Sequence, residues 1–134
     1  MNFKVPILMY HMVAETYDTN ESKYCCSPSK FKNQMVYLKK TGYKVIGLNE
    51  LVDTIKNGGQ LHRKSVVITL DDGYMDNWKN AFPILQKFRF PATVFVISQL
   101  VGHTNEWVQK DGCKKQKLLG WSELKKMVAK GITI

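Results

Sequence analysis

Long hydrophobic runs are missing from this 134-residue sequence. No apolar stretch approaches the ~20 residues that a membrane-spanning helix needs. The N-terminal segment, MNFKVPILMYHMV, also lacks the small-residue cleavage site of a signal peptide. We therefore interpret it as a first strand and expect no transmembrane segment.

Several chemical signatures are also absent. The three cysteines, Cys25, Cys26 and Cys113, have no zinc-finger spacing, and an odd number does not make a disulfide framework. Adjacent cysteines such as Cys25 and Cys26 rarely bridge each other because the geometry is strained. The sequence has no glycine-rich phosphate loop with Lys and Ser/Thr, so it gives only a weak signal for phosphoryl transfer.

Acidic residues are few relative to basic ones: 11 Asp and Glu face 20 Lys and Arg, for a net charge of +9. A basic surface can attract nucleic acid, an anionic polymer or a membrane. However, the arginine and aromatic alternation of a nucleic-acid platform is missing. We expect a lysine-rich solvated surface and no nucleic-acid partner.

The hydrophobic pattern predicts alternating strands and helices in one domain, residues 1–134, with no linker or repeat. Strands are expected at 5–11, 44–48, 65–72, 92–97 and 132–134. Helices are expected after the caps Ser27, Asn49, Asn80 and Ser122, and a long polar loop at 98–120. Hairpin signals are absent, so the fold class is α/β with a parallel sheet, open or closed as a barrel. Five strands are about half of a barrel of ~250 residues.

Two adjacent carboxylates, Asp71 and Asp72, end the apolar strand SVVITLDD and precede Gly73. In parallel α/β folds the carboxyl ends of the strands carry the chemistry. Two carboxylates held so close repel unless a cation lies between them or one is protonated. One Asp could then bind a divalent metal while the other accepts a proton from metal-bound water. The alternative is an ordinary strand-to-helix turn, in which Asp and Gly are favoured for local reasons.

A family resemblance favours the functional interpretation. ITLDDGY resembles the first signature of the polysaccharide deacetylases, family 4 of the carbohydrate esterases, with Leu70 in place of the usual Phe. Four further segments are similar, in order, to the branch that acts on poly-N-acetylglucosamine: PILMYHMV, SPSKFKNQMVYLKKTGYKVIGLNEL, NAFPILQKFRFPATVFVI and LLGWSELKKMVAKGITI. The resemblance therefore covers nearly the whole chain.

The resemblance implies the N-terminal part of a distorted, seven-stranded (β/α) barrel, TIM-like and with parallel strands. It also implies hydrolysis of N-acetyl groups on a hexosamine polysaccharide, with Asp71 as general base and Asp72 as a metal ligand. The family metal is usually zinc, with cobalt or nickel sometimes active, and members act at the cell envelope or outside the cell. The family's two metal-binding histidines follow the strand that GITI begins, so we expect a chain truncated at its C-terminal side and without a complete site.

Three further residues are candidates for substrate contact. His11 ends the first strand and His103 lies in the long loop, so both are expected at the same edge as the Asp pair, and Tyr74 follows Gly73. Each has a structural alternative, namely a hydrogen-bonded or solvated side chain. For the chain as a whole, the alternative to an enzyme is a non-catalytic carbohydrate-binding or scaffold fragment of the same fold. Exposed sheet edges would also favour self-association.

Overall fold

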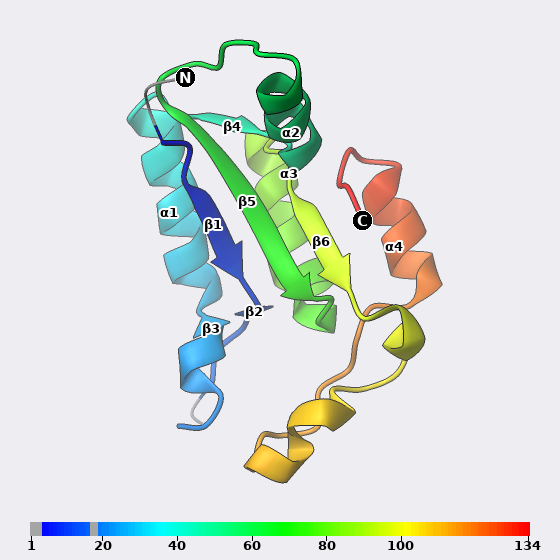
Figure 1. Ribbon diagram of the computed structural model, residues 1–134. Helices are drawn as coiled ribbons and strands as arrows, with labels where there is room; N and C mark the ends of the chain where they lie inside the picture. The colour runs from blue at the N-terminus through cyan, green and yellow to red at the C-terminus, as the bar shows by residue number, and fades with distance from the viewer. Residues whose placement is uncertain (1–3, 17–18) are drawn as a thin grey trace.

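The computed structural model describes residues 4–16 and 19–134, whose strands and helices alternate along the chain (Figure 1). The strands are β1 (Ile7–Tyr10), β2 (Met12–Val13), β3 (Cys25–Cys26), β4 (Lys44–Ile46), β5 (Ser65–Asp72) and β6 (Thr93–Val96). The α-helices are α1 (Pro28–Lys40), α2 (Leu48–Lys56), α3 (Phe82–Phe88) and α4 (Trp121–Val128). A π-helix, Asn77–Ala81, runs directly into α3, and short 3₁₀ helices form at Ser22–Tyr24, Ser98–Leu100 and Glu106–Asp111.

Strand β5 is the centre of a four-stranded parallel sheet. Its Val67 pairs with Ile7 of β1 and with Ile46 of β4, so β1 and β4 lie on opposite edges of β5. Strand β6 follows β4 along that second edge and pairs with the last four residues of β5. The parallel α/β class is therefore confirmed. The seven-stranded barrel stays a prediction, as does self-association through the sheet edges.

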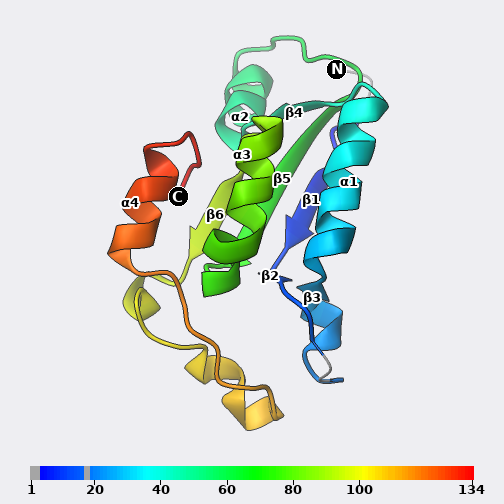
Figure 2. The ribbon, with the colours of Figure 1, turned by 180° about the vertical axis from the view of Figure 1, so that it is seen from behind.

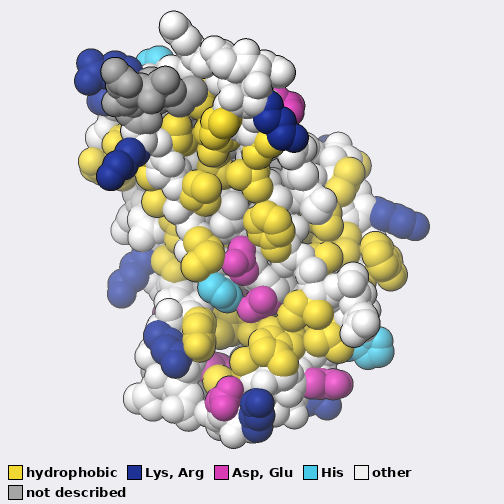
Figure 3. All heavy atoms as spheres, viewed as in Figure 1, with side chains coloured by type: hydrophobic (Ala, Val, Ile, Leu, Met, Phe, Trp, Pro, Cys, Tyr) yellow, Lys and Arg dark blue, Asp and Glu magenta, His cyan; other side chains and the backbone are white. Residues whose placement is uncertain are grey.

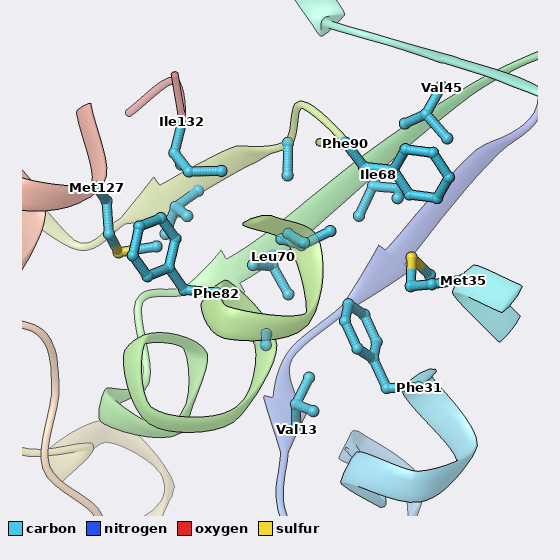
Figure 4. Close-up of a cluster of buried hydrophobic side chains, with 14 of the residues drawn as sticks. Val13, Phe31, Met35, Val45, Ile68, Leu70, Phe82, Phe90, Met127 and Ile132 are labelled. Carbon is cyan, nitrogen blue, oxygen red and sulfur yellow. The ribbon is translucent and has the colours of Figure 1, made fainter. Parts of the chain in front are cut away.

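One face of the sheet is covered by α1 and α3, as the view from behind shows (Figure 2). The alternation of β5 sends Ile68 and Leu70 toward these helices, where they meet Phe31 and Met35 of α1 (Figure 4). Phe31 and Met35 are fully buried and lie at helical spacing in α1. This cluster fixes β5, and with it the position of the carboxylates at its end.

The opposite face of the sheet is largely open. Helix α2 packs its Leu51 against Val67 near the start of β5. On the rest of this face, Ile7, Met9 and Phe95 are each at least 50% exposed. Figure 3 shows this face as a hydrophobic surface with acidic and histidine side chains in its middle. Asp71 belongs to this face because its register partner is the exposed Phe95.

Several helix starts differ from the predictions, although Ser27 does cap α1 by accepting from the Lys30 N–H at 3.3 Å. Helix α2 begins after Gly47 rather than after a cap at Asn49, and α4 begins after Gly120 rather than after Ser122. In α4 the Glu123 carboxylate accepts from the Gly120 N–H at 3.1 Å, which replaces a serine cap. The proposed cap Asn80 lies inside the π-helix instead, because its side chain bonds to the N-terminal segment.

Three other local predictions are corrected. Residues 132–134 form only an isolated bridge, Thr133 to Thr93 of β6, in place of a strand. The expected loop 98–120 contains two of the 3₁₀ helices. The small parallel pair of β2 with β3 was not predicted, because two-residue strands carry no periodicity. In the described part of the chain, the helices are too short and too polar to cross a bilayer.

Candidate functional site

Asp71 and Asp72 are the last two residues of β5, at the carboxyl end of the sheet. Asp72 and the residue after it, Gly73, both have left-handed backbone conformations, with φ 70° and φ 68°. Asp tolerates this region better than most residues, whereas a Cβ at Gly73 would lie 3.1 Å from Cγ1 of Val96. Gly73 therefore allows the turn, as the sequence predicts. The positive φ of Asp72 moves its carboxylate away from the position that a regular strand would give it.

The Asp72 carboxylate faces His11, which lies just after β1. Nε2 of His11 is 3.9 Å from Oδ2 of Asp72, with side chains 25% and 28% exposed. Burial raises the pKa of Asp72, and the Asp71 carboxylate adds to this, whereas the charge of His11 opposes it. The desolvated carboxyl pair would favour a nearby cation, since positive charge stabilises the ionised form.

One oxygen of the neighbouring carboxylate has no partner. Oδ1 of Asp71 is buried and accepts no hydrogen bond from the described residues. A buried polar atom of this kind calls for a reason, such as a bound water, an ion or a catalytic role. An unoccupied acceptor beside a second carboxylate is suited to take a proton from a water molecule held between them.

The residues around the pair fit a metal site only in part. The Asp72 carboxylate is an oxygen ligand of the kind zinc accepts. A stable zinc site needs three or four protein ligands, and no group of three or more His, Cys, Asp or Glu within residues 4–16 and 19–134 is placed to hold a metal ion. Asp72 therefore fits as one ligand of a larger set.

A cavity of about 290 Å³ opens beside Asp72. It is lined by His11, Tyr24, Asp72, Tyr74, Trp107 and Val108. Tyr24 comes from the 3₁₀ helix before β3, and Trp107 from the 3₁₀ helix after β6. The cavity thus has aromatic walls from segments far apart in the sequence. Pockets that combine aromatic walls with a few polar groups are typical of small-ligand sites.

Two of the three predicted substrate residues line this cavity. His11 faces it beside Asp72, and Tyr74 lies on its wall with its ring 6.2 Å from that of Trp107. Burial raises the pKa of Tyr74 to about 12. His103 is exposed and lies outside the lining residues, where its backbone pairs with Leu100 and Leu118. Contact of His103 with substrate stays a prediction.

Sequence reasoning did not select Tyr24, Trp107 or Val108 as site residues. Tyr24 carries no recognisable motif, and its 3₁₀ helix of three residues shows no periodicity. Trp107 lies in a segment that was expected to be a loop. The available signal was only positional: both segments adjoin the carboxyl ends of strands, where α/β folds place their sites.

The segment that carries His11 is held in place by three polar side chains near the start of the π-helix. Asp76 Oδ1 accepts from the Val13 N–H at 2.8 Å, and Asn77 Nδ2 donates to the His11 carbonyl at 2.8 Å. Asn80 Nδ2 donates to the Val13 carbonyl at 2.7 Å. Asn77 is fully buried. These bonds fix the backbone of His11 opposite Asp72.

Burial of Asp76 makes stability depend on pH. Desolvation raises its pKa to about 6, although the Val13 N–H and the Asn77 amide oppose this. Its neighbours Cys25 and Tyr74 are uncharged in this range, since their pKa values are raised to about 11 and about 12. The folded chain binds the proton of Asp76 more tightly than the unfolded chain does. This preference stabilises the fold fully below pH ~4, and the stabilisation is lost as the pH rises through about 6.

We expect Asp76→Asn to remove this dependence while keeping the oxygen that accepts from Val13. At about 1.4 kcal/mol per pKa unit, the free energy of unfolding of the wild-type chain, relative to Asp76→Asn, falls by about 2 kcal/mol between pH 4 and 6.5. Urea denaturation of both proteins across that range measures the difference. A difference that stays flat would contradict the assignment.

Comparison with known proteins adds a second line of information. The family model described as polysaccharide deacetylase matches residues 58–134. The Bacillus subtilis protein YxkH is 30% identical over 131 residues, 98% of this chain and 41% of that protein. The poly-beta-1,6-N-acetyl-D-glucosamine N-deacetylase of Staphylococcus epidermidis is 37% identical over 82 residues, 61% of this chain and 28% of that enzyme.

Solved structures give the same picture. IcaB from Ammonifex degensii matches with a TM-score of 0.81 and 29% identity, over 97% of this chain and 50% of that one. The Streptococcus pyogenes deacetylase PplD, solved in complex with acetate, matches with a TM-score of 0.73 and 26% identity, over 96% of this chain and 54% of that one. The chain thus spans about half the length, or less, of the proteins it matches.

Proposed function

The chain belongs to the polysaccharide deacetylase family, and we propose that its Asp pair takes part in metal-dependent removal of N-acetyl groups from a hexosamine polysaccharide. The observation that carries this proposal is the buried, unpartnered Oδ1 of Asp71 beside Asp72 at the end of β5. The names of the staphylococcal relatives and the acetate bound to PplD support the substrate and the product. We further propose that residues 1–134 are part of one deacetylase domain with a seven-stranded barrel.

Asp71 is the general base in this proposal. Its free oxygen accepts a proton from the attacking water, whose oxygen then adds to the acetyl carbon of the substrate. The C–N bond breaks, acetate leaves, and the amine nitrogen takes up a proton, which balances the one that Asp71 accepted from the water. Oδ1 of Asp71 accepts no hydrogen bond from the described residues, so this oxygen is available for the transfer.

Asp72 is proposed as one metal ligand, with zinc as the metal and cobalt or nickel as substitutes. When bound, the ion polarises the acetyl carbonyl and the attacking water. Burial raises the pKa of Asp72, and a nearby cation would stabilise its ionised form. We propose histidines, the residue type that the family resemblance implies, as the other ligands.

His11, Tyr74 and His103 are proposed to contact the sugar. His11 and Tyr74 border the cavity beside Asp72, where a hexosamine unit would place its acetamido group. Asn77 donates to the backbone carbonyl of His11, and this bond holds the His11 segment in place without a substrate. His103 is exposed and lies outside the lining of this cavity, so we propose that it meets a more distant part of the polymer.

The proposal is tested by acetate release from N-acetylglucosamine oligomers. A protein that carries residues 1–134 followed by the remainder of a deacetylase domain should release acetate. Removing the metal with a chelator should abolish the activity, and zinc, cobalt or nickel should restore it. Release that is indifferent to the chelator would contradict a metal-dependent mechanism.

A second function, carbohydrate binding without catalysis, is favoured by one observation. Among residues 4–16 and 19–134, no group of three or more His, Cys, Asp or Glu side chains is placed to hold a metal ion. In this case the chain would bind oligosaccharide equally well with and without metal, and no acetate would be released by the longer protein.

A further inference from the structure

The side chain of Asn77 is fully buried at the start of the π-helix, shortly after the turn at Gly73. Its amide nitrogen uses both of its hydrogens. Nδ2 donates to the His11 carbonyl at 2.8 Å and to Oδ1 of Asp76 at 3.0 Å. Both partners are acceptors, so only the amino group of Asn77 can face them. The two bonds therefore fix the orientation of the amide.

This orientation leaves the other end of the amide without a partner. Oδ1 of Asn77 is buried and accepts no hydrogen bond within the part of the chain that the structure describes. A buried acceptor left unpaired costs stability. A side chain kept for stability alone is expected to satisfy both ends of its amide. The unpaired oxygen therefore indicates that the donor end of Asn77 has a further role.

The donor end of Asn77 acts on the backbone where the chain leaves β1. The ladder between β1 and β5 ends one residue before His11. Asn77 holds the carbonyl of His11, and Oδ1 of Asp76 accepts from the Val13 N–H at 2.8 Å. Because Asn77 and Asp76 are bonded to each other, one connected pair of side chains holds the backbone at both His11 and Val13.

The imidazole of His11 is held less directly than its backbone. Nε2 of His11 is 3.9 Å from Oδ2 of Asp72, which is beyond hydrogen-bond distance. On another side, the ring centroid lies 5.6 Å from that of Tyr24, with the two planes tilted by 52°. Neither contact fixes the ring as a hydrogen bond would. The position of the imidazole therefore depends on the backbone of His11, which Asn77 holds.

We propose that Asn77 is a positioning residue for the deacetylase reaction, and that its bond to the His11 carbonyl keeps the imidazole beside Asp72 and the sugar cavity. The inference rests on the proposed function, in which His11 contacts the sugar. It goes further by assigning the geometry of that contact to a side chain that does not line the cavity. A displacement of about 1 Å at a reacting centre can cost about 100-fold in rate, so loss of this bond should lower activity.

The first measurement follows the position of His11 by NMR in the 134-residue chain, without substrate or metal. The rings of His11 and Tyr24 lie close enough for nuclear Overhauser effects (NOEs) between their protons. Asn77→Ala removes the bond to the His11 carbonyl, and we expect these NOEs to be lost. Asn80→Ala is a second variant at a half-buried position, and it removes the bond to the Val13 carbonyl. It should weaken the same NOEs with less risk to the fold.

The second measurement is kcat/KM for N-acetylglucosamine oligomers in the protein that contains the full domain. Asn77→Ala should lower it by about 10-fold to 100-fold, as expected for a residue that orients a site residue from outside the site. Asn80→Ala should lower it by about 3-fold to 10-fold, the equivalent of one hydrogen bond.

The matched control is Ser65→Ala, at the opposite end of β5. It also truncates a buried side chain that donates to a backbone carbonyl, that of His62 at 2.7 Å. It should keep both the NOEs and kcat/KM. An equal loss of activity in Ser65→Ala would show a general effect of destabilisation and overturn the positioning role.

Three further results would overturn the proposal: NOEs that are absent from the wild-type chain, NOEs that survive in both Asn77→Ala and Asn80→Ala, or an unchanged kcat/KM in Asn77→Ala. The NOEs also separate this inference from the proposed function. If Asn77→Ala removes them but the unmodified longer protein releases no acetate, Asn77 does position His11 and the proposed activity fails.

Discussion

Asp71→Asn should reduce acetate release by about 100-fold to 10,000-fold while leaving metal binding intact. The substitution keeps the shape of the side chain but removes the basic oxygen, and general-base catalysis contributes a factor of this size. Because Asp71 lies on the open face of the sheet, with Oδ1 unpartnered, the amide breaks no hydrogen bond of the fold at that atom. The measurement is kcat for N-acetylglucosamine oligomers with the protein that contains the full domain.

Zinc affinity of the Asp71→Asn variant, measured by calorimetry, separates the two roles in the pair. It should match that of the unmodified protein. Asp53→Asn on α2 is the control for a generic loss of one negative charge and should keep full activity. Activity that survives Asp71→Asn within a factor of 2 would show that another group acts as the base.

Asp72→Asn should lower zinc affinity by more than about 100-fold. Partners in the outer shell of a metal site already account for 10-fold to 100-fold in affinity, so loss of a direct carboxylate ligand exceeds that range. Asn is the matched replacement because, like Asp, it tolerates the positive φ of 70° at this position. The fold of the turn is therefore retained, and the change reports on the ligand alone.

Calorimetry with zinc on the protein that contains the full domain, before and after the substitution, gives the result. The same titration on residues 1–134 should show weak binding in both forms, since the described residues hold no set of three ligands. Tight zinc binding by residues 1–134 that Asp72→Asn leaves unchanged would contradict the assignment of Asp72.

The regular part of the fold could be predicted from the sequence because it follows periodicity. Phe31 and Met35 at helical spacing gave α1, and the continuous apolar run before Asp71 gave the buried β5. The position of the Asp pair at the carboxyl edge followed from the parallel topology. These features depend on patterns that extend over a whole helix or strand, in which many side chains support the same structure.

The remaining features depend on single tertiary contacts. The left-handed conformation of Asp72 and the π-helix have no periodic signal, and the hydrogen bond from Asn80 to Val13 joins residues 67 apart in the sequence. The cavity walls formed by Tyr24 and Trp107 arise the same way, since each comes from a short 3₁₀ helix. Local propensity cannot specify which distant segments meet.

The three side-chain bonds that hold the His11 segment also set the smallest piece of chain that can form the site. They join residues that are 63, 66 and 67 positions apart, so every residue from 11 to 80 lies within the loop that they close. Closing so long a loop costs entropy, and the packing of α1 and β5 within it offsets that cost. A peptide that spans only the Asp pair lacks these partners and would not place His11 beside Asp72.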